Sequence, residues 1–297
     1  MRLKVNNYIY KNPKLDNFTI LNFSDTHSDV TNLSLIIEYL KKKKVDLILV
    51  PGDVLDRIDI DNKEFIKKFK ELPKYAKTYI VIGNHDNLLT NNKMLSLDSL
   101  NYNNYIREIK DTKNIYLSTD SYQKIEINNK IDLCFVVPPN YYYQKKEDMK
   151  ISKQFLSTLE DEKIDKKKFN IMLIHTPRAI LEKKKIIDNK LINSMDLILA
   201  GHNHGGLTPT SIQDTFNNHT GLFGPYYSIL EPHAYGIFKK DNTHLLVSNG
   251  VTKISKTTIL KKIGYSLNNI LVPEVDVITF KKDKNYNLEL INREIDK

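Results

Sequence analysis

Gly201-His202-Asn203-His204-Gly205-Gly206 directly follows the largely apolar run 196–200. Two histidines one residue apart can both turn toward one point only on a sharply bent loop. The flanking glycines let the backbone approach whatever lies at that point. A short apolar run bounded by turn residues is typical of a buried strand. The stretch therefore predicts a strand whose end presents two imidazole rings.

Other apolar runs in the chain end in polar side chains of the same kind. The runs are 18–23, 45–50, 78–82 and 170–174, and their polar ends are, in chain order, Asp25-Thr26-His27, Gly52-Asp53, Gly83-Asn84-His85-Asp86 and His175. Ligands at the carboxyl ends of parallel strands converge on the crevice where such folds bind substrate. We therefore expect these side chains to meet at one site.

Helical patterns separate several of these runs. Residues 31–44 carry apolar side chains at helical spacing, and residues 61–72 begin with the capping pattern Asp61-x-x-Glu64. Strands that alternate with helices, and that are apolar throughout, predict an α/β fold with a sheet buried on both faces. Further helices are expected near 94–110 and 150–159, and further strands at 124–127, 131–137 and within about 235–291. The polar start suggests no strand, and no linker divides residues 1–297, so we expect a single domain.

Composition narrows the class of protein. The formal net charge of +9 comes almost wholly from lysine, since arginine occurs only at positions 2, 57, 107, 178 and 293. Such a charge can attract nucleic acid or anionic lipid, but the lysines are scattered, which favours an ordinary solvated surface.

The single cysteine, Cys134, lies in an apolar run and fits a core position in a reducing compartment. The first residues show no signal-peptide pattern, and no apolar run is long enough to span a membrane. We expect a soluble, cytoplasmic protein; peripheral membrane contact and the oligomeric state stay open.

The strand-end residues form a candidate metal site. Imidazole, carboxylate and amide donors without thiolate suit Mn²⁺ first, and also Fe, Zn²⁺ or Ni²⁺. The donors exceed what one four-coordinate ion takes, but they match two divalent ions that share a bridging carboxylate. Each motif alone could be a turn, a helix cap or a core histidine. Their conjunction, always at a strand end, favours a site built from Asp25, His27, Asp53, Asn84, His175, His202 and His204.

These motifs together resemble the calcineurin-like metallophosphoesterase superfamily. The resemblance rests on Asp25-x-His27, Gly52-Asp53-x-x-Asp56, Gly83-Asn84-His85-Asp86, His175 and Gly201-His202-x-His204. It implies a four-layered α/β/β/α sandwich of two mixed β-sheets flanked by helices, with a dinuclear metal centre. It also implies that the first metal is held by Asp25, His27, Asp53 and His204. The second would be held by Asn84, His175 and His202 together with the bridging Asp53.

The same resemblance suggests roles for residues that bind no metal. His85 would face the leaving group and donate a proton to it, and Asp56 would keep His85 charged and oriented. Arg57 could contact a substrate phosphate, although a surface arginine is an equally good interpretation. Tyr141 and Tyr142, in a tyrosine triplet after Pro138-Pro139, could form a rim that stacks on substrate or could be ordinary loop residues.

The branch of the superfamily is set by details of the motifs. Ile58 and Asp86 replace the glycine and glutamate of the serine/threonine protein phosphatases, so that branch is disfavoured. The Gly-His-x-His-Gly-Gly ending is similar to a bacterial branch of phosphodiesterases related to UDP-diacylglucosamine hydrolases, although Asn203 stands where a threonine is usual. We therefore expect a phosphodiesterase in which a hydroxide bound to a dinuclear metal centre attacks a small-molecule phosphate ester. The alternatives are a nuclease or cyclic-nucleotide phosphodiesterase, and a catalytically silent binding scaffold.

Overall fold

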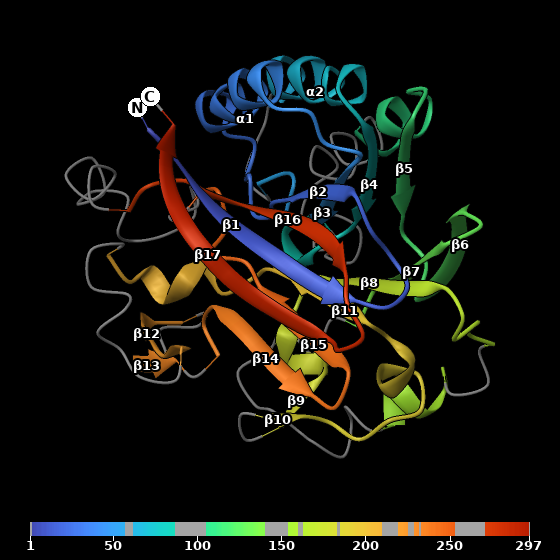
Figure 1. Cartoon of the computed structure of the whole chain (residues 1–297). Helices are drawn as coiled ribbons and strands as arrows, with labels where there is room; N and C mark the ends of the chain where they lie inside the picture. Colours follow the sequence, from blue (N-terminus) through green and yellow to red (C-terminus); the bar gives the residue numbers. More distant parts are fainter. Residues whose placement is uncertain are drawn as a thin grey trace.

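The computed structural model describes residues 2–56, 62–86, 105–139, 154–159, 163–182, 185–209, 219–224, 229–231, 233–252 and 271–296. Within these residues two mixed β-sheets pack face to face, and helices flank them (Figure 1). The expectation of an α/β sandwich of two mixed sheets with flanking helices is confirmed. Among the described helices, none combines the length and the apolar character needed to cross a bilayer.

The first sheet has seven strands, and its central part is parallel. Strands β2, β3, β4 and β5 run parallel, whereas β16 is antiparallel to β2 and parallel to β1. In spatial order the strands are β17 (Asn287–Asp296), β1 (Leu3–Asn12), β16 (Glu274–Lys282), β2 (Phe18–Asn22), β3 (Leu47–Pro51), β4 (Lys77–Val81) and β5 (Ile115–Ser118).

The second sheet has six strands, of which the inner four are parallel to one another. In spatial order they are β14 (Gly236–Lys240), β15 (Thr243–Val247), β11 (Leu197–Ala200), β8 (Phe169–Ile174), β7 (Ile131–Val136) and β6 (Tyr122–Asn128). Two small hairpins lie apart from the main sheets: β9 (Leu181–Glu182) with β10 (Lys185–Ile186), and β12 (Gly221–Phe223) with β13 (Ile229–Glu231).

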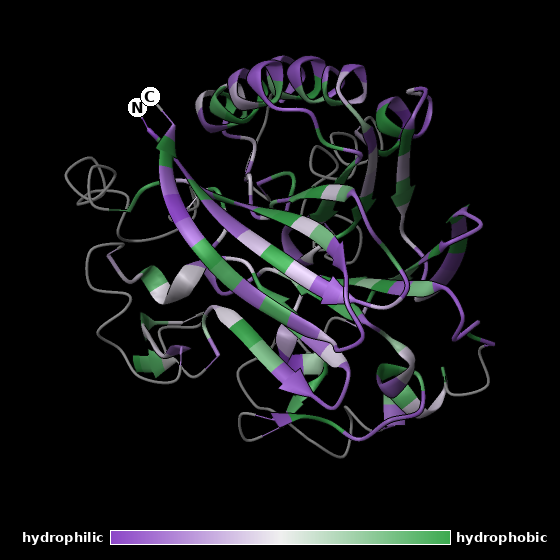
Figure 2. Cartoon of the chain, viewed as in Figure 1, coloured by the Kyte–Doolittle hydropathy of each residue, from purple (hydrophilic) through white to green (hydrophobic). Residues whose placement is uncertain are grey.

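Two helices cover the outer face of the first sheet and turn their hydrophobic residues toward it (Figure 2). Helix α1 (Val30–Lys42) begins at the N-cap Asp29, whose carboxylate accepts a hydrogen bond from the Asn32 backbone N–H. Helix α2 (Lys63–Phe69) begins after Asn62 and is shorter than expected, while Asp61 of the expected cap lies outside the described residues.

The core follows the two-residue period of the strands. In β7, Leu133 and Phe135 face the first sheet, whereas Cys134 and Val136 belong to a second cluster on the outer face. That second cluster is covered by the helical residues 154–157 and by the short helices 177–179 and 192–194. Cys134 is a buried free thiol, in agreement with its expected core position.

The polar start of the chain forms a strand, so the expectation for this segment was wrong. Strand β1 lies inside the first sheet between β16 and β17, and Leu3–Asn6 are buried. Its burial depends on polar partners brought from the C-terminal end of the chain: Lys4 pairs with Glu274 at 3.1 Å, and Asn6 donates to Asp276 at 3.1 Å.

Candidate active site

The loops that follow β2, β3 and β4 of the first sheet meet the loops that follow β8 and β11 of the second. Across the sheets, His175 Nε2 lies 3.1 Å from Asp53 Oδ2. The backbone N–H of His202 donates to the Asp25 carboxylate at 3.1 Å. The carboxyl ends of parallel strands from both sheets therefore open onto one space, as expected for a ligand site in a fold of this kind.

Asp53 is at the centre of this cluster. Its Oδ2 atom lies 3.1 Å from His175 Nε2 and 4.0 Å from His27 Nε2, while its Oδ1 accepts a hydrogen bond from the His85 backbone N–H at 2.8 Å. His27 in turn lies against His204, with 3.4 Å between the two Nε2 atoms. One carboxylate thus contacts both groups of imidazoles, which is the position that a bridging ligand requires.

Two histidines have their ring orientation set by backbone carbonyl groups. His175 Nδ1 lies 2.7 Å from the Pro51 carbonyl oxygen, and His204 Nδ1 lies 2.8 Å from the Thr252 carbonyl oxygen. A carbonyl oxygen only accepts, so each Nδ1 carries the hydrogen and each Nε2 is turned into the site. Metal-binding histidines commonly have this outer contact.

The atoms around His175 fit a bound cation. Its Nε2 faces Asn84 Oδ1 and Asp53 Oδ2, each at 3.1 Å. With the hydrogen on Nδ1, these three atoms are all acceptors unless His175 takes up a second proton. A divalent ion that replaces that proton would satisfy all of them, so the donor set fits a metal.

The electrostatics of the buried groups agree with this interpretation. Burial favours neutral His175, but the charge and hydrogen bond of Asp53 outweigh it and raise the pKa of His175 to about 9. Burial likewise opposes the charged form of Asp53, yet the neighbouring imidazoles, His175 foremost, hold its pKa well below the usual value. Burial lowers the pKa of His27 and of His202, so both rings are neutral and able to bind a metal.

The backbone of these loops is bent at the candidate ligands themselves. Five of them adopt a left-handed conformation, with φ of 58° at Asp25, 45° at His27, 52° at Asp53, 74° at His202 and 48° at His204. Glycines make room beside them: a Cβ atom on Gly52 would lie 2.6 Å from His175 Nδ1. Strained backbone of this kind is concentrated at functional sites.

Three sets of side chains place donor atoms within 4.8 Å of one another: Asp25, His27 and His204; His27, Asp53 and His85; and Asp53, His175 and His202. The first and third sets correspond to the two expected metal positions, and Asn84 adjoins the third through His175. The second set includes His85, which was expected not to bind metal. Its ring centroid lies 4.5 Å from that of His27, and its Nδ1 lies 3.8 Å from Asp56 Oδ1, as the expected pairing requires.

The structure thus brings together all seven expected ligands with His85 and Asp56. Arg57, Tyr141 and Tyr142 lie outside the described residues. Asp86, the last residue of the Gly83-Asn84-His85-Asp86 motif, accepts hydrogen bonds from the backbone N–H groups of Gly83 and Leu55, each at 2.9 Å, and so joins the loops after β3 and β4. Burial and the nearby charge of Asp53 raise the pKa of Asp86 to about 6.

Sequence reasoning missed two contributors to the site. Thr252 acts through its backbone carbonyl group, which leaves no trace in a sequence. Arg178 follows His175 by three residues, and its charge is among the causes that lower the pKa of His202. A basic residue just beyond a strand-end histidine was the signal that could have identified Arg178.

Comparisons with known proteins agree with this site. A family model described as calcineurin-like phosphoesterase matches residues 18–206. An uncharacterized metallophosphoesterase of Helicobacter pylori strain J99 is 25% identical over 222 residues, which are 73% of this chain and 49% of that protein. The uncharacterized metallophosphoesterase YkuE of Bacillus subtilis is 27% identical over 277 residues, which are 90% of this chain and 80% of that protein. The chain therefore spans about half the length of the Helicobacter pylori relative.

Solved structures show only a distant likeness. A phosphopantetheinyl hydrolase from Mycobacterium tuberculosis is similar with a TM-score of 0.40 and 11% identity, over 79% of this chain and 90% of that one. An archaeal phosphodiesterase is similar with a TM-score of 0.39 and 12% identity, over 92% of this chain and 100% of that one. At these scores the likeness carries no weight for either fold or function.

Proposed function

The chain belongs to the calcineurin-like phosphoesterase family, and from this premise we propose that it is a metal-dependent hydrolase of phosphate diesters. The observation that carries the proposal is the position of Asp53, whose carboxylate contacts imidazoles of both donor groups. One divalent ion would be held by Asp25, His27, Asp53 and His204. The other would be held by Asp53, Asn84, His175 and His202.

When bound, two such ions supply a nucleophile at neutral pH and neutralise the charge that develops on the phosphoryl oxygens. The protein's own residues fix the geometry. The outer contacts of His175 and His204 turn their Nε2 atoms inward. The Asp25 carboxylate is held by the Ser24 hydroxyl and by the His202 backbone N–H. These contacts preorganise the donors before any ligand arrives, which limits the reorganisation that binding requires.

His85 is the proposed proton donor to the departing alkoxide. Its side chain is 13% exposed, whereas that of His27 is completely buried, so His85 lies where the site opens toward substrate. Asp56 lies 3.8 Å from His85 Nδ1 and is itself fully buried, so its carboxylate can orient the ring and stabilise the imidazolium form. Arg178, whose charge helps to lower the pKa of His202, is a second cation that could contact a phosphoryl oxygen.

The preference for diesters is supported by the sequence around Gly201–Gly206, which resembles that of the bacterial phosphodiesterase branch. Mn²⁺ is the proposed ion because it accepts this mixture of oxygen and imidazole donors. The second candidate is hydrolysis of a cyclic nucleotide or of nucleic acid, which the net charge of +9 favours. A nuclease would bind single-stranded DNA with an affinity that falls steeply as salt is added.

The test is hydrolysis of bis(p-nitrophenyl) phosphate in Mn²⁺, compared with the monoester p-nitrophenyl phosphate. Asp53→Asn should lower the rate at least about 100-fold, since even outer contacts of metal ligands change activity by about 10- to 100-fold. The control is Asp46→Asn, at an exposed position just before β3, at the end of that strand opposite to the site. Metal analysis of the unaltered protein should give two ions per chain. Fewer than one ion per chain under Mn²⁺ loading would instead indicate a silent scaffold.

A further inference from the structure

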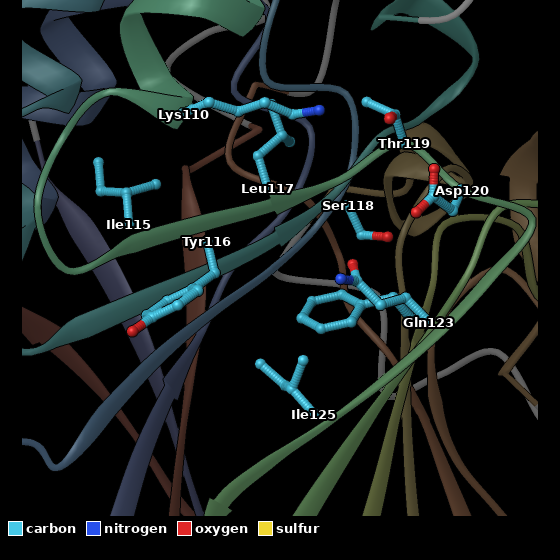
Figure 3. A pocket seen from close by; sticks show the side chains of 10 residues that line it. Lys110, Ile115, Tyr116, Leu117, Ser118, Thr119, Asp120, Gln123 and Ile125 are labelled. Carbon is cyan, nitrogen blue, oxygen red and sulfur yellow. The ribbon is translucent and has the colours of Figure 1, made fainter.

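A cavity of about 290 Å³ lies between the edge strands of the two sheets (Figure 3). Strand β5 ends the first sheet, β6 ends the second, and only residues 119–121 connect them. The cavity is lined by residues of both strands and by Phe135 of β7, and none of the nine candidate metal ligands and proton-transfer residues lines it. It is therefore a separate opening into the space between the sheets.

Ser118 provides the first indication of a ligand. Its side chain lines the cavity, the residue is only 2% exposed, and its hydroxyl has no hydrogen-bond partner among the described residues. A buried hydroxyl without a partner costs stability that a bound polar atom would recover. Figure 3 shows the Gln123 amide extending from β6 toward Ser118. Together they place a hydroxyl and an amide, both able to donate and accept, at one wall of the cavity.

Aromatic rings also line the cavity. The ring of Tyr116 stacks on that of Tyr79, with centroids 4.8 Å apart and planes inclined by 9°. Tyr116 is 45% exposed, so its second face is open, and it lines the cavity with the buried Phe135. An open tyrosine face is a surface on which a flat ring can stack.

The charges at the cavity do not suit an anion. The two charged residues that line it are Lys110 and Asp120, and their opposite charges cancel. The buried Ser118 is neutral, and the Asp120 carboxylate would repel a phosphate. We propose that this cavity binds an uncharged planar ring with hydrogen-bond donors and acceptors along its edge, the chemistry of a nucleobase.

The cavity lies one strand away from the candidate active site. Ser118 pairs with Val81 of β4, its carbonyl oxygen accepts from the Ile82 N–H at 3.3 Å, and Asn84 and His85 follow directly along that strand. A substrate with its phosphate at the metal centre could place its ring in this cavity. This link between the two sites rests on the proposed function, whereas the binding of a ring in the cavity does not.

The experiment measures binding of adenosine and uridine, with ribose as the comparison, to the metal-free 297-residue chain by saturation-transfer NMR and calorimetry. Both nucleosides lack a phosphate, and EDTA is present, so a failure of the proposed hydrolysis leaves the measurement unaffected. We expect the nucleosides to bind and ribose not to bind. Ser118→Ala and Gln123→Ala should each weaken binding about three- to tenfold, and Tyr116→Ala should weaken it further.

Ser157→Ala is the matched control, because Ser157 is exposed and its hydroxyl donates to the Gln154 carbonyl oxygen away from the cavity. Asp53→Asn should also leave nucleoside affinity unchanged. Gln123 is exposed, so its variant tests the proposal even if Ser118→Ala alters folding, which circular dichroism would reveal. Absence of nucleoside binding at millimolar concentration overturns the proposal, as does binding that the Ser118 and Gln123 variants leave unchanged.

Discussion

His204 Nδ1 lies 2.8 Å from the carbonyl oxygen of Thr252, so a loop of the second sheet orients a histidine that the sequence places 48 residues earlier. The same loop contacts the first sheet: the Val251 N–H donates to the Ser24 carbonyl oxygen and the Thr252 N–H to the Asp25 carbonyl oxygen, each at 2.9 Å. Residues 248–252 therefore fix the relative positions of two candidate ligands that come from different sheets.

The Thr252 hydroxyl should matter for metal affinity although it cannot contact the ions. It donates to the Thr26 carbonyl oxygen at 2.9 Å and accepts from Asn32 Nδ2 at 3.2 Å, which fixes the carbonyl group that orients His204. Thr252→Val removes both hydrogen bonds and keeps the shape of the side chain. We expect about a tenfold weaker affinity for one of two Mn²⁺ ions, measured by calorimetry.

The matched control is Thr243→Val. Thr243 is also buried, and its hydroxyl also donates to backbone carbonyl groups, those of Met195 and Ile192, at the other end of β15. This variant should lose stability but bind both ions with unchanged affinity. If the two variants weaken metal binding equally, the role assigned to Thr252 is wrong.

His85 should be needed for catalysis and not for metal binding. We expect His85→Ala to lower kcat about 10²- to 10⁴-fold and to retain two ions per chain. The loss should be largest for diesters with a poor leaving group, because a good leaving group departs without a proton. Asp56→Asn should lower kcat less than His85→Ala does, since the Asp56 variant leaves the His85 ring in place. Loss of an ion in His85→Ala would show instead that His85 is a ligand.

Metal affinity should rise with pH between about pH 7 and pH 9. The pKa of His175 is raised to about 9 in the metal-free protein, so below that pH a proton must leave before Nε2 can bind an ion. Each pH unit should therefore raise the affinity roughly tenfold until the proton is lost, above which it levels off. Nitrogen NMR of metal-free protein should show His175 protonated at pH 8, and added Zn²⁺ should displace the proton. A His175 ring that is neutral at pH 7 would contradict this expectation.

The buried pair of Lys4 and Glu274 should be important for stability. The two side chains are 3% and 1% exposed, and 3.1 Å separates Lys4 Nζ from Glu274 Oε2. Lys4→Met leaves a buried carboxylate without its cation and should lower the free energy of unfolding by about 3–5 kcal/mol. Urea denaturation measures this.

The double variant Lys4→Met/Glu274→Gln should recover part of the loss, since no buried charge is then unpaired. Lys41→Met, in the exposed pair with Glu38, should change stability far less than Lys4→Met, because water screens the exposed pair. Equal effects of the buried and exposed single variants would contradict the importance of the buried pair.

The sequence was sufficient to predict much of the fold and the meeting of the strand-end side chains at one place, because apolar strands and their polar ends are both local signals. Strand β1 was missed for the opposite reason. Its residues Lys4 and Asn6 are buried, but each has a polar partner about 270 residues away. No local pattern distinguishes such a strand from a polar tail. The carbonyl group of Thr252 was not predictable either, since any residue supplies one and only the fold brings it to His204.

The left-handed backbone at Asp25, His27, Asp53, His202 and His204 lowers the stability of the folded chain at the candidate ligands themselves. Each of these residues raises the energy of the folded chain by about 1–2 kcal/mol relative to glycine, which adopts the same conformation freely. Glycine at these positions would relieve that strain, although it would lose more backbone entropy on folding. This chain instead has a candidate metal ligand at each of them, so we infer that part of its stability is given up for the chemistry of the site.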